Sequence, residues 1–572
     1  MKLLLFGVQV VFLWIFVLAS NEARAESNVT VLFDHEEMQF EVSPFIEEGS
    51  TLVPFRSIFE KMGFDVFWNE EEQTVTGEKV GLRITLPINS SIAYVNDKPI
   101  KLQIPAKIVD NVTVVPLRFI SENSGYSINW DSDTRIVSIQ TPDNILPDQL
   151  NPLGIVAFNV KQFGAKGDGL TNDTQAIQTA LQQVSIKNST LFLPSGTYLI
   201  DATQKLTVSS NTKIFGEGAT TVLKAKSDEE FGSNLLTISG DYIEISHLTL
   251  DGDQRAINIV LVDSNSSNII VSNCVIENAS QSSDPSRDDY NEVVSGVTIY
   301  GNTTDITIDH TEIKNMKAIH ENQGSLVARG IYLTENKSGW HEKAAMHVSI
   351  INNFIHDIGP ADDGDGIFYE DPNLSRDVKE DTNSKISNNR FENCAKRAIK
   401  INAQGVQIIG NQIINNYLNN NYYKGKDEGS LAPDMYAGIS IYADNTMISD
   451  NILQGVGSYY AGIEIAAERM VSHVIINNNK IKMGATSNQK GTTGIRIGYV
   501  DYFTISNNEL ENGGTGIWTW QSASNGIIKG NKINMPRGGG INLETYLPNN
   551  YKRNIEINNN HIHASDYDVN RA

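Results

Sequence analysis

A repeated alternation of aliphatic and polar positions marks the second half of the chain. An aliphatic residue is followed by two or three Asn or Ser residues and then by further aliphatic positions. Clear copies are Ile386-Ser-Asn-Asn-Arg-Phe391, Ile476-Asn-Asn-Asn-Lys-Ile481 and Ile557-Asn-Asn-Asn-His-Ile562. Repeats with a period of about 20–50 residues are typical of solenoids. Together with short Ile- and Val-rich segments from about residue 190, they predict a mainly β protein whose residues 156–572 form a right-handed parallel β-helix.

The repeated Asn predicts a ladder in which stacked side-chain amides hydrogen-bond between successive coils. This role is structural rather than catalytic. The predicted members are Asn273, Asn353, Asn389, Asn411, Asn451, Asn479, Asn508, Asn531 and Asn560.

A second strand in each coil has the form Gly-Ile-x-Ile-x, as in Gly366-Ile-Phe-Tyr-Glu370 and Gly494-Ile-Arg-Ile-Gly498. Strand alternation turns the Ile side chains inward and both x side chains outward. We call the first x positions the lysine row: Thr298, Tyr332, Phe368, Lys400, Ser440, Glu464, Arg496, Trp518 and Asn542. The second x positions are the edge row: Tyr300, Thr334, Glu370, Asn402, Tyr442, Ala466, Gly498, Trp520 and Glu544. The residues before the Gly or Ala add the arginine row: Arg329, Asp365 and Arg397.

This outward face combines aromatic side chains with a central group of charged side chains, which is what a chain of sugar rings needs for binding. Coils lie ~4.8 Å apart, so a sugar chain would advance about one residue per coil. Insertions at residues 316–346, 371–384 and 418–434 interrupt the short spacing and could wall a groove. The predicted substrate-binding residues are Arg329, Tyr332, Phe368, Tyr442, Trp518, Trp520 and Glu544.

The first 155 residues carry different signals. Lys2, an apolar run and the small-residue pattern Ala23-Arg24-Ala25 predict a signal peptide over residues 1–25, and no later stretch could span a membrane. Residues 28–141 contain a duplication, because Thr51-Leu-Val-Pro-Phe-Arg56 recurs as Thr113-Val-Val-Pro-Leu-Arg118. Each copy continues with a short helical stretch and ends at a Trp, which predicts a small duplicated α+β domain. Residues 142–155 are a Pro-containing linker.

Both halves resemble known families. The duplicated segment resembles the copper amine oxidase-like N-terminal stalk domain of Gram-positive surface proteins, and its single His35 offers no copper site. The run from Phe158 to Ile177 resembles the opening segment of the pectate lyase-like superfamily, of polygalacturonase-like families and of phage tailspikes. Its amphipathic end predicts a helix that caps the first coil. The resemblance implies an exported protein, with possible cell-wall contact through the stalk domain.

Charge and cysteine content narrow the class of partner. A formal net charge of −23 disfavours nucleic acid as a partner. The two cysteines, Cys274 and Cys394, stand about three coils apart, on the order of 14 Å, which is too far for a disulfide. We therefore expect two buried thiols and a fold that depends on packing.

Cleavage of an acidic, uronate-containing polysaccharide by β-elimination is the reaction that this face favours first. It needs a base for the proton next to the carboxyl group and positive charge for the enolate-like intermediate. Lys400 is the better base candidate, since a neighbouring Arg397 and partial burial favour a neutral amine. Arg496 is the second candidate, and Arg397 and Arg329 are carboxylate clamps. Pectate lyase-like enzymes commonly use Lys or Arg as the base, often with Ca²⁺, for which Asp363, Asp365 and Glu370 are candidate ligands.

Two other functions remain open. A glycoside hydrolase or transglycosylase would need two carboxylates within about 10 Å, and Glu370 and Glu464 lie about three coils apart. Glu370 with Asp363 or Asp365, or Glu464 with Glu468, would be close enough. Asp362-Asp363 and Arg397-Ala-Ile-Lys400 resemble parts of the polygalacturonase pattern, but the chain has no Gly-His-Gly. The third possibility is a non-catalytic carbohydrate-binding protein displayed on the cell wall.

Overall fold

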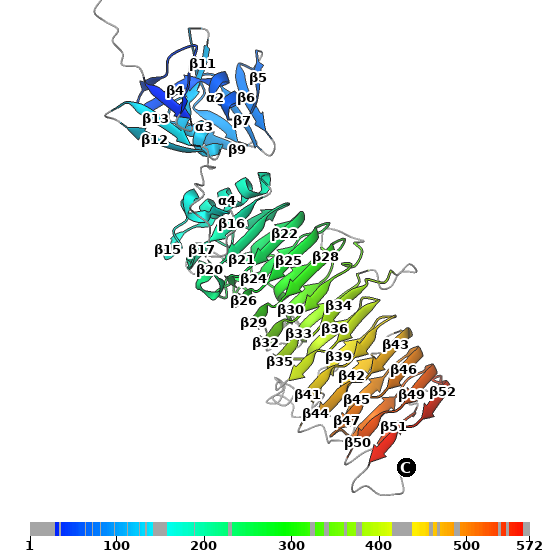
Figure 1. The fold of residues 1–572 in the computed structure, drawn as a ribbon. Coiled ribbons are helices and arrows are strands. Elements are labelled where there is room, and N and C mark those ends of the chain that lie inside the picture. Colours follow the sequence, from blue (N-terminus) through cyan, green and yellow to red (C-terminus); the bar gives the residue numbers. More distant parts are fainter. Residues whose placement is uncertain are drawn as a thin grey trace, which may run out of the picture. The chain divides into compact units, whose positions relative to one another are not determined.

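The chain divides into two compact units, Met1–Gln149 and Leu150–Ala572 (Figure 1). The computed structural model describes residues 29–140 and 157–563, apart from residues 34–35, 63, 71, 80–81, 96–97, 111, 125, 132–133, 188, 227–230, 321–326, 337–341, 360–362, 373–379, 415–436, 457–460, 466–468, 485–491, 536–538 and 545–547. The predicted signal peptide and linker, residues 1–25 and 142–155, lie outside the described residues. No helix within the described ranges has the length and hydrophobicity that a membrane span requires.

The first unit confirms the predicted α+β duplication. In the first copy, β4 (Ser50–Pro54) leads into α2 (Phe55–Lys61) and β5 (Asp65–Asn69), which contains Trp68. In the second copy, β11 (Val112–Pro116) leads into α3 (Leu117–Asn123) and β12 (Ser127–Asp131), which contains Trp130. The two copies meet where β4 and β11 pair antiparallel, with Val53 opposite Val115. The remaining strands are β1 (Thr30–Phe33), β2 (Glu36–Glu37), β3 (Phe45–Glu47), β6 (Thr74–Lys79), β7 (Leu82–Pro87), β8 (Ile92–Val95), β9 (Lys98–Lys101), β10 (Lys107–Val109) and β13 (Ile136–Gln140).

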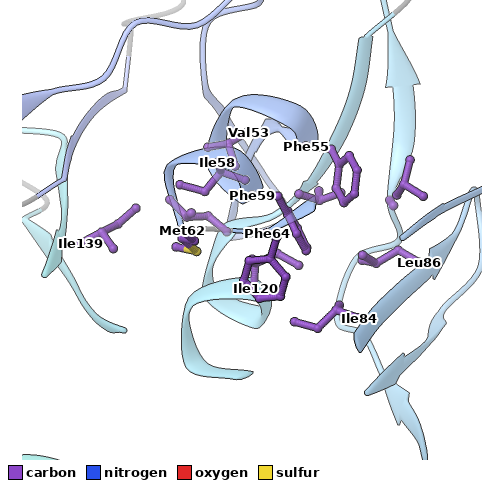
Figure 2. Close-up of a cluster of buried hydrophobic side chains, with 14 of the residues drawn as sticks. Val53, Phe55, Ile58, Phe59, Met62, Phe64, Ile84, Leu86, Ile120 and Ile139 are labelled. Atoms are coloured by element: carbon purple, nitrogen blue, oxygen red, sulfur yellow. The ribbon is translucent and has the colours of Figure 1, made fainter. Parts of the chain in front are cut away.

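The core of this unit is built around the aromatic side chains of α2 and the residues after it (Figure 2). The ring centroid of Phe59 lies 4.3 Å from that of Phe55 and 4.9 Å from that of Phe64. Ile84 and Leu86 from β7 and Ile120 from α3 complete the cluster and are fully buried. A single apolar core therefore joins both copies into one folding unit.

Near the start of the second unit, after two short strands, lies α4 (Thr174–Ile186), the capping helix that the sequence predicts. Its buried side chains are Thr174, Ile177, Ala180, Leu181 and Val184, which form one face. This face packs on β16 (Thr190–Leu193) and β18 (Leu206–Ser209), the first coil of the solenoid. The helix thus covers apolar surface that has no preceding coil to bury it.

Three long parallel sheets run the length of this unit, which confirms the predicted β-helix (Figure 1). Each complete coil contributes one strand to each sheet, and the third sheet lacks a strand beside the first and the last strands of the other two. The first sheet extends from β14 (Phe158–Asn159) to β52 (Lys552–Asn558), and the second from β15 (Asp168–Asn172) to β53 (His561–His563). The third sheet contains β18, β21 (Gly232–Ser239), β24 (Ala256–Val262), β27 (Val294–Ile299), β30 (Val327–Leu333), β33 (Asp363–Tyr369), β36 (Arg397–Ile401), β39 (Ala437–Ile441), β42 (Ala461–Ile465), β45 (Thr493–Ile497), β48 (Thr515–Thr519) and β51 (Gly539–Asn542).

The glycine of the Gly-Ile-x-Ile pattern, which lies within most strands of the third sheet, is explained by close packing. A Cβ atom on Gly366 would lie 2.7 Å from the carbonyl oxygen of Ala398 and 2.8 Å from the ring of Phe391. The next coil and the second sheet therefore leave no room for a side chain, and the strand turns its following Ile367 into the core.

The Asn ladder is confirmed from Asn353 to Asn560 and lies between the first and second sheets. The side-chain oxygen of Asn451, for example, accepts hydrogen bonds from the backbone N–H and the side-chain amide of Asn411, each over 2.9 Å. Its own amide nitrogen donates to the carbonyl oxygen of Ile408 and to Asn479. Each amide thus links adjacent coils inside a site closed to solvent.

The prediction that Asn273 belongs to the ladder is wrong. Asn273 is exposed and has a φ of 52°, whereas its neighbour Cys274 takes the buried position. The next ladder position is Thr311, whose N–H donates to the side-chain oxygen of Asn353 over 2.9 Å. Asn suits the left-handed turn position as well as the ladder position beside it, so the sequence alone could not separate the two.

Both cysteines are free and buried, as predicted. Cys274 precedes β26 (Val275–Glu277), and Cys394 ends β35 (Arg390–Cys394). Between these strands the second sheet places β29 (Glu312–Met316) and β32 (Phe354–Ile358), so the two thiols are three coils apart. Burial raises the pKa of the Cys274 thiol to about 12, which makes it an unreactive core residue.

Candidate active site

The predicted lysine row is confirmed as a line of neighbouring residues on the third sheet. The strand register pairs Phe368 with Lys400, Lys400 with Ser440, and Ser440 with Glu464. It continues through Arg496, Trp518 and Asn542. At one strand spacing of ~4.8 Å per coil, side chains that are over a hundred positions apart in the sequence lie along one line.

The side chains of the lysine row are less exposed than those on the open outward face of a solvated solenoid would be. Glu464 is fully buried, and Arg496 and Phe368 are 4% and 6% exposed. Lys400, Tyr332, Trp518, and the edge-row residues Glu370, Tyr442 and Trp520 are half-buried, whereas Glu544 is exposed. The face is therefore a largely buried layer of polar and aromatic side chains. Of the three charged residues in the lysine row, Lys400, Glu464 and Arg496, Lys400 is the most exposed.

The arginine row is a buried chain of charges beside the lysine row. The register places Arg329 next to Asp365 and Asp365 next to Arg397. Nη1 of Arg329 lies 3.0 Å from Oδ2 of Asp365, and Nη1 of Arg397 lies 3.1 Å from Oδ1 of the same carboxylate. Arg397 and Asp365 are fully buried and Arg329 is 3% exposed. Two guanidinium groups thus share one buried carboxylate, and the three side chains of the row carry one formal positive charge between them.

Aromatic rings connect the arginine row to Lys400. The guanidinium of Arg329 lies 5.1 Å from the ring centroid of Phe368, and the ring of Tyr332 stacks on that of Phe368 at 5.6 Å. On the next coil, Nζ of Lys400 lies 4.4 Å from the centroid of Phe368 and 5.8 Å from that of Tyr442. Cation–π attraction of this kind strengthens as the cation loses water, so these rings help to fix the lysine.

Glu370, the edge-row residue two positions after Phe368, accepts two hydrogen bonds. Its Oε2 receives the hydroxyl of Thr334 over 2.8 Å and the hydroxyl of Tyr332 over 3.2 Å. Burial first, and the charge of Glu370 second, raise the pKa of Tyr332 well above its usual range. Tyr332 therefore stays protonated and can act as a hydrogen-bond donor, but it is not a base at neutral pH.

Two further contacts define the other side of Lys400. Ser440 donates a hydrogen bond over 2.7 Å to Oε1 of Glu464, and both side chains are fully buried. Beyond them, the guanidinium of Arg496 lies 4.4 Å from the ring centroid of Trp520 and 5.3 Å from that of Trp518. Arg496 is thus held against two indoles, and a guanidinium group carries its charge throughout the neutral pH range.

The structure describes two of the three predicted calcium ligands, Asp365 and Glu370. Asp365 does not fit the role, because its buried carboxylate lies between two guanidinium groups. Glu370 receives two hydroxyl groups, and the side chain of Asp363 lies outside the described residues, as do Asp362 and Glu468. Across the described ranges no group of three or more His, Cys, Asp and Glu side chains could hold a metal ion. Asp365 is equally unsuited to act with Glu370 as a hydrolytic pair of carboxylates, because its carboxylate contacts both guanidinium groups.

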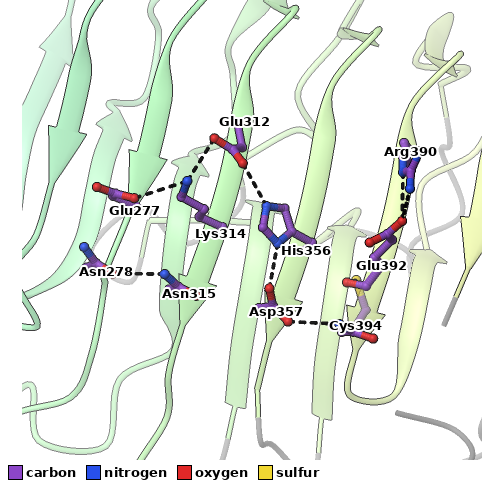
Figure 3. Close-up of polar contacts among 11 residues, drawn as sticks. Glu277, Asn278, Glu312, Lys314, Asn315, His356, Asp357, Arg390, Glu392 and Cys394 are labelled. Atoms are coloured by element: carbon purple, nitrogen blue, oxygen red, sulfur yellow. Dashed lines mark hydrogen bonds and ion pairs between the residues drawn. The ribbon is translucent and has the colours of Figure 1, made fainter. Parts of the chain in front are cut away.

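A second polar cluster, which the sequence did not predict, lies on the second sheet (Figure 3). His356 has Nε2 3.1 Å from Oε1 of Glu312 and Nδ1 2.7 Å from Oδ2 of Asp357. Lys314 lies 2.9 Å from Glu312 and 3.5 Å from Glu277. The same strand alternation that defines the lysine row would have found it, had it been applied to the strand after each Asn turn. Its charged groups are paired with one another, which suits a structural role.

Three family models match consecutive parts of the chain. The copper amine oxidase N-terminal domain covers residues 32–139. The family described as rhamnogalacturonase A/epimerase, pectate lyase-like, covers residues 157–427, and the right handed beta helix region covers residues 437–567. The second unit is a right-handed β-helix that is similar to the pectate lyase-like family over residues 157–427. The resemblances of both halves are thereby confirmed.

Curated relatives match short stretches of the chain. Alginate lyase 7 of Azotobacter vinelandii is 38% identical over 109 residues, which are 17% of this chain and 13% of that protein. The mannuronan C5-epimerase AlgE2 of the same bacterium is 35% identical over 109 residues, 17% of this chain and 11% of that protein. The preneck appendage protein of Bacillus phage PZA is 32% identical over 114 residues, 19% of this chain and 12% of that protein. The chain thus spans only a small part of the length of these relatives.

Among solved structures, the pectate lyase-like β-helix is similar to PfbA, a surface adhesin of Streptococcus pneumoniae. The TM-score is 0.51 at 16% sequence identity, and the match covers 69% of this chain and 93% of that chain. This likeness concerns the fold alone.

Proposed function

We propose that the β-helix is a carbohydrate-active enzyme that acts on a uronate-containing polysaccharide at the outward face of the third sheet. The observation that carries this proposal is the placement of Lys400. It is half-buried between the rings of Phe368 and Tyr442, with Arg397 of the arginine row on its own strand and Asp365 and Arg329 on the two preceding coils. A basic group next to fixed positive charge is what removal of a proton beside a carboxylate requires.

In this proposal Lys400 takes the C5 proton of a uronate, and Arg329, Arg397 and Arg496 supply the positive potential that stabilises the enolate-like intermediate. Departure of the oxygen at C4, with a proton from water, then completes β-elimination. Tyr442, Trp518 and Trp520 are half-buried rings on which neighbouring sugars would stack. The names of two relatives, an alginate lyase and a mannuronan C5-epimerase, support the substrate class, because both polymers consist of uronates and both reactions begin at C5.

Hydrolysis is the second candidate. The carboxylates of Glu370 and Glu464 favour it only weakly, because they stand three coils apart, on the order of 14 Å, beyond the separation of either hydrolytic mechanism. Glu464 is also fully buried. A non-catalytic carbohydrate-binding role would use the same aromatic face without the charged centre.

The test is incubation of the full chain with polymannuronate, polyguluronate, polygalacturonate and a neutral glucan as a control. We expect one of the uronate polymers to develop the ultraviolet absorbance of an unsaturated uronate. New reducing ends without that absorbance would instead establish hydrolysis. Incorporation of deuterium at C5 from heavy water, without chain cleavage, would establish epimerisation. Binding without any of these changes would leave a carbohydrate-binding protein.

We further propose that the protein acts outside the cell, with the first unit as a stalk that contacts the cell wall. The predicted signal peptide at residues 1–25 and the copper amine oxidase N-terminal domain match support this location. Fractionation of the producing cells tests it: the protein belongs in the medium or the wall fraction. Recovery of the full-length chain from the cytoplasm alone would contradict it.

A further inference from the structure

Asp365 occupies an unusual place for a carboxylate on the outward face of a sheet. It is fully buried, and it contacts Arg329 on one neighbouring strand and Arg397 on the other, at 3.0 Å and 3.1 Å. A carboxylate in such a place cannot reach a substrate. Removing one member of a buried ion pair leaves the charge of its partner uncompensated. The carboxylate of Asp365 therefore holds the guanidinium groups of Arg329 and Arg397 in their buried positions.

The two arginines have different surroundings, and Arg329 connects Asp365 to the candidate base. The guanidinium of Arg329 lies over the ring of Phe368, and Nζ of Lys400 lies 4.4 Å from the centroid of the same ring. Phe368 is 6% exposed and also stacks on Tyr332. The ring of Phe368 therefore contacts the guanidinium of Arg329 from the preceding coil and the ammonium group of Lys400 from the following coil.

We propose that Asp365 is a positioning residue for Lys400. It acts through Arg329 and Phe368. This role of Asp365 differs from metal binding. Of the measurements that test it, only the measurement of activity rests on the proposed function. The role makes a structural claim that can be measured without any substrate: loss of the Asp365 carboxylate moves Lys400 away from the ring of Phe368.

The experiment uses the full chain with 13C at the ε carbon of lysine. Protons above an aromatic ring are shifted upfield, so the Lys400 signal, assigned by its absence in Lys400→Gln, reports its contact with Phe368. In Asp365→Asn we expect this signal to lose at least half of its upfield shift. Asp365→Asn combined with Arg329→Gln keeps the net charge of the arginine row at one positive, so it serves as the variant that folds if the single change does not. The same loss of shift is expected there.

The matched control is Asp251→Asn on the second sheet. Asp251 is 7% exposed and contacts Lys224 at 3.1 Å, so its loss also removes a nearly buried carboxylate from an ion pair. We expect Asp251→Asn to lower the melting temperature and to leave the Lys400 signal in place. An unchanged Lys400 signal in folded Asp365 variants would overturn the inference and leave Asp365 a purely structural residue. Failure of both Asp365 variants to fold would overturn it as well, since the row would then serve the fold as a whole.

If a uronate polymer is turned over, the activity adds a second measurement. A positioning residue without substrate contact should lower kcat by about tenfold to a hundredfold and leave KM nearly unchanged. Absence of turnover in the unaltered protein would contradict the proposed function, and the Lys400 signal would still decide the role of Asp365.

Discussion

The hydroxyl group of Ser440 donates a hydrogen bond to Oε1 of Glu464 over 2.7 Å, and neither side chain is exposed. Both residues belong to the outward face of the third sheet, where side chains of a solenoid usually meet water. Their burial means that Glu464 depends on protein groups for its hydrogen bonds, and Ser440 is one of these groups.

Replacing Ser440 with Ala should therefore destabilise the second unit. A buried carboxylate oxygen that loses its donor costs about 1–3 kcal/mol of unfolding free energy. Urea unfolding followed by far-ultraviolet circular dichroism measures the difference. The matched control is Ser524→Ala, which removes a hydrogen bond of the same length to Asp501, a residue that keeps contact with solvent. Equal losses in the two variants would contradict the importance of burial at Glu464.

Lys400→Gln should abolish turnover of the uronate polymer while the protein stays folded. A missing general base lowers the rate by roughly 10²–10⁴-fold. Lys400→Arg tests the chemistry separately, because it keeps the positive charge and cannot act as a base near neutral pH. We expect it to be nearly as inactive as Lys400→Gln.

The control for both changes is Lys385→Gln, an exposed lysine on β34 (Ser384–Ser387) of the first sheet. Its rate should equal that of the unaltered protein. Turnover by Lys400→Gln within a few fold of normal would remove Lys400 from the mechanism.

The sequence predicted the neighbours along the lysine row because its alternation is strict. A shift by one residue would turn the inward Ile of each coil outward and move polar or bulky side chains into the packed interior, so one register satisfies all coils. Burial was not predicted, because it depends on what lies over the outward face and not on the strand itself. For this reason Asp365 was expected as a calcium ligand, whereas its neighbours in space are Arg329 and Arg397.

The pH dependence of stability tests the polar cluster on the second sheet. Partial burial alone would raise the pKa of Glu312, but hydrogen bonds from Lys314 and His356 outweigh it and lower that pKa. A carboxyl group whose pKa is lower in the folded state stabilises the fold above its unfolded pKa, and this contribution disappears as the pH falls through the folded value. Glu312→Gln should therefore be less stable than the unaltered protein at pH 7.

The difference should shrink as the pH falls through the acidic range, because both proteins then carry a neutral group at this position. Melting temperatures of the two proteins between about pH 7 and pH 3 measure the gap, a range that spans the usual titration of a Glu side chain. A gap that stays constant with pH would show that the loss comes from packing and not from the charge of Glu312.

The distinction between Asn451 and Asn273 offers a test of the coil register itself. Asn451 is fully buried in the ladder, and its removal leaves the amide of Asn411 and the carbonyl oxygen of Ile408 without their partner. Each such buried group costs about 1–3 kcal/mol, so Asn451→Gly should lose at least about 2 kcal/mol of unfolding free energy. Asn273→Gly changes an exposed residue with a φ of 52°, a conformation that glycine adopts without strain, and should lose less than about 1 kcal/mol. Because both variants introduce glycine, their effects on the unfolded chain are alike, and the difference between them in urea unfolding measures the ladder. Equal losses would mean that the ladder amides contribute no more than a turn residue, and the alignment of coils on which the lysine row depends would lose its structural basis.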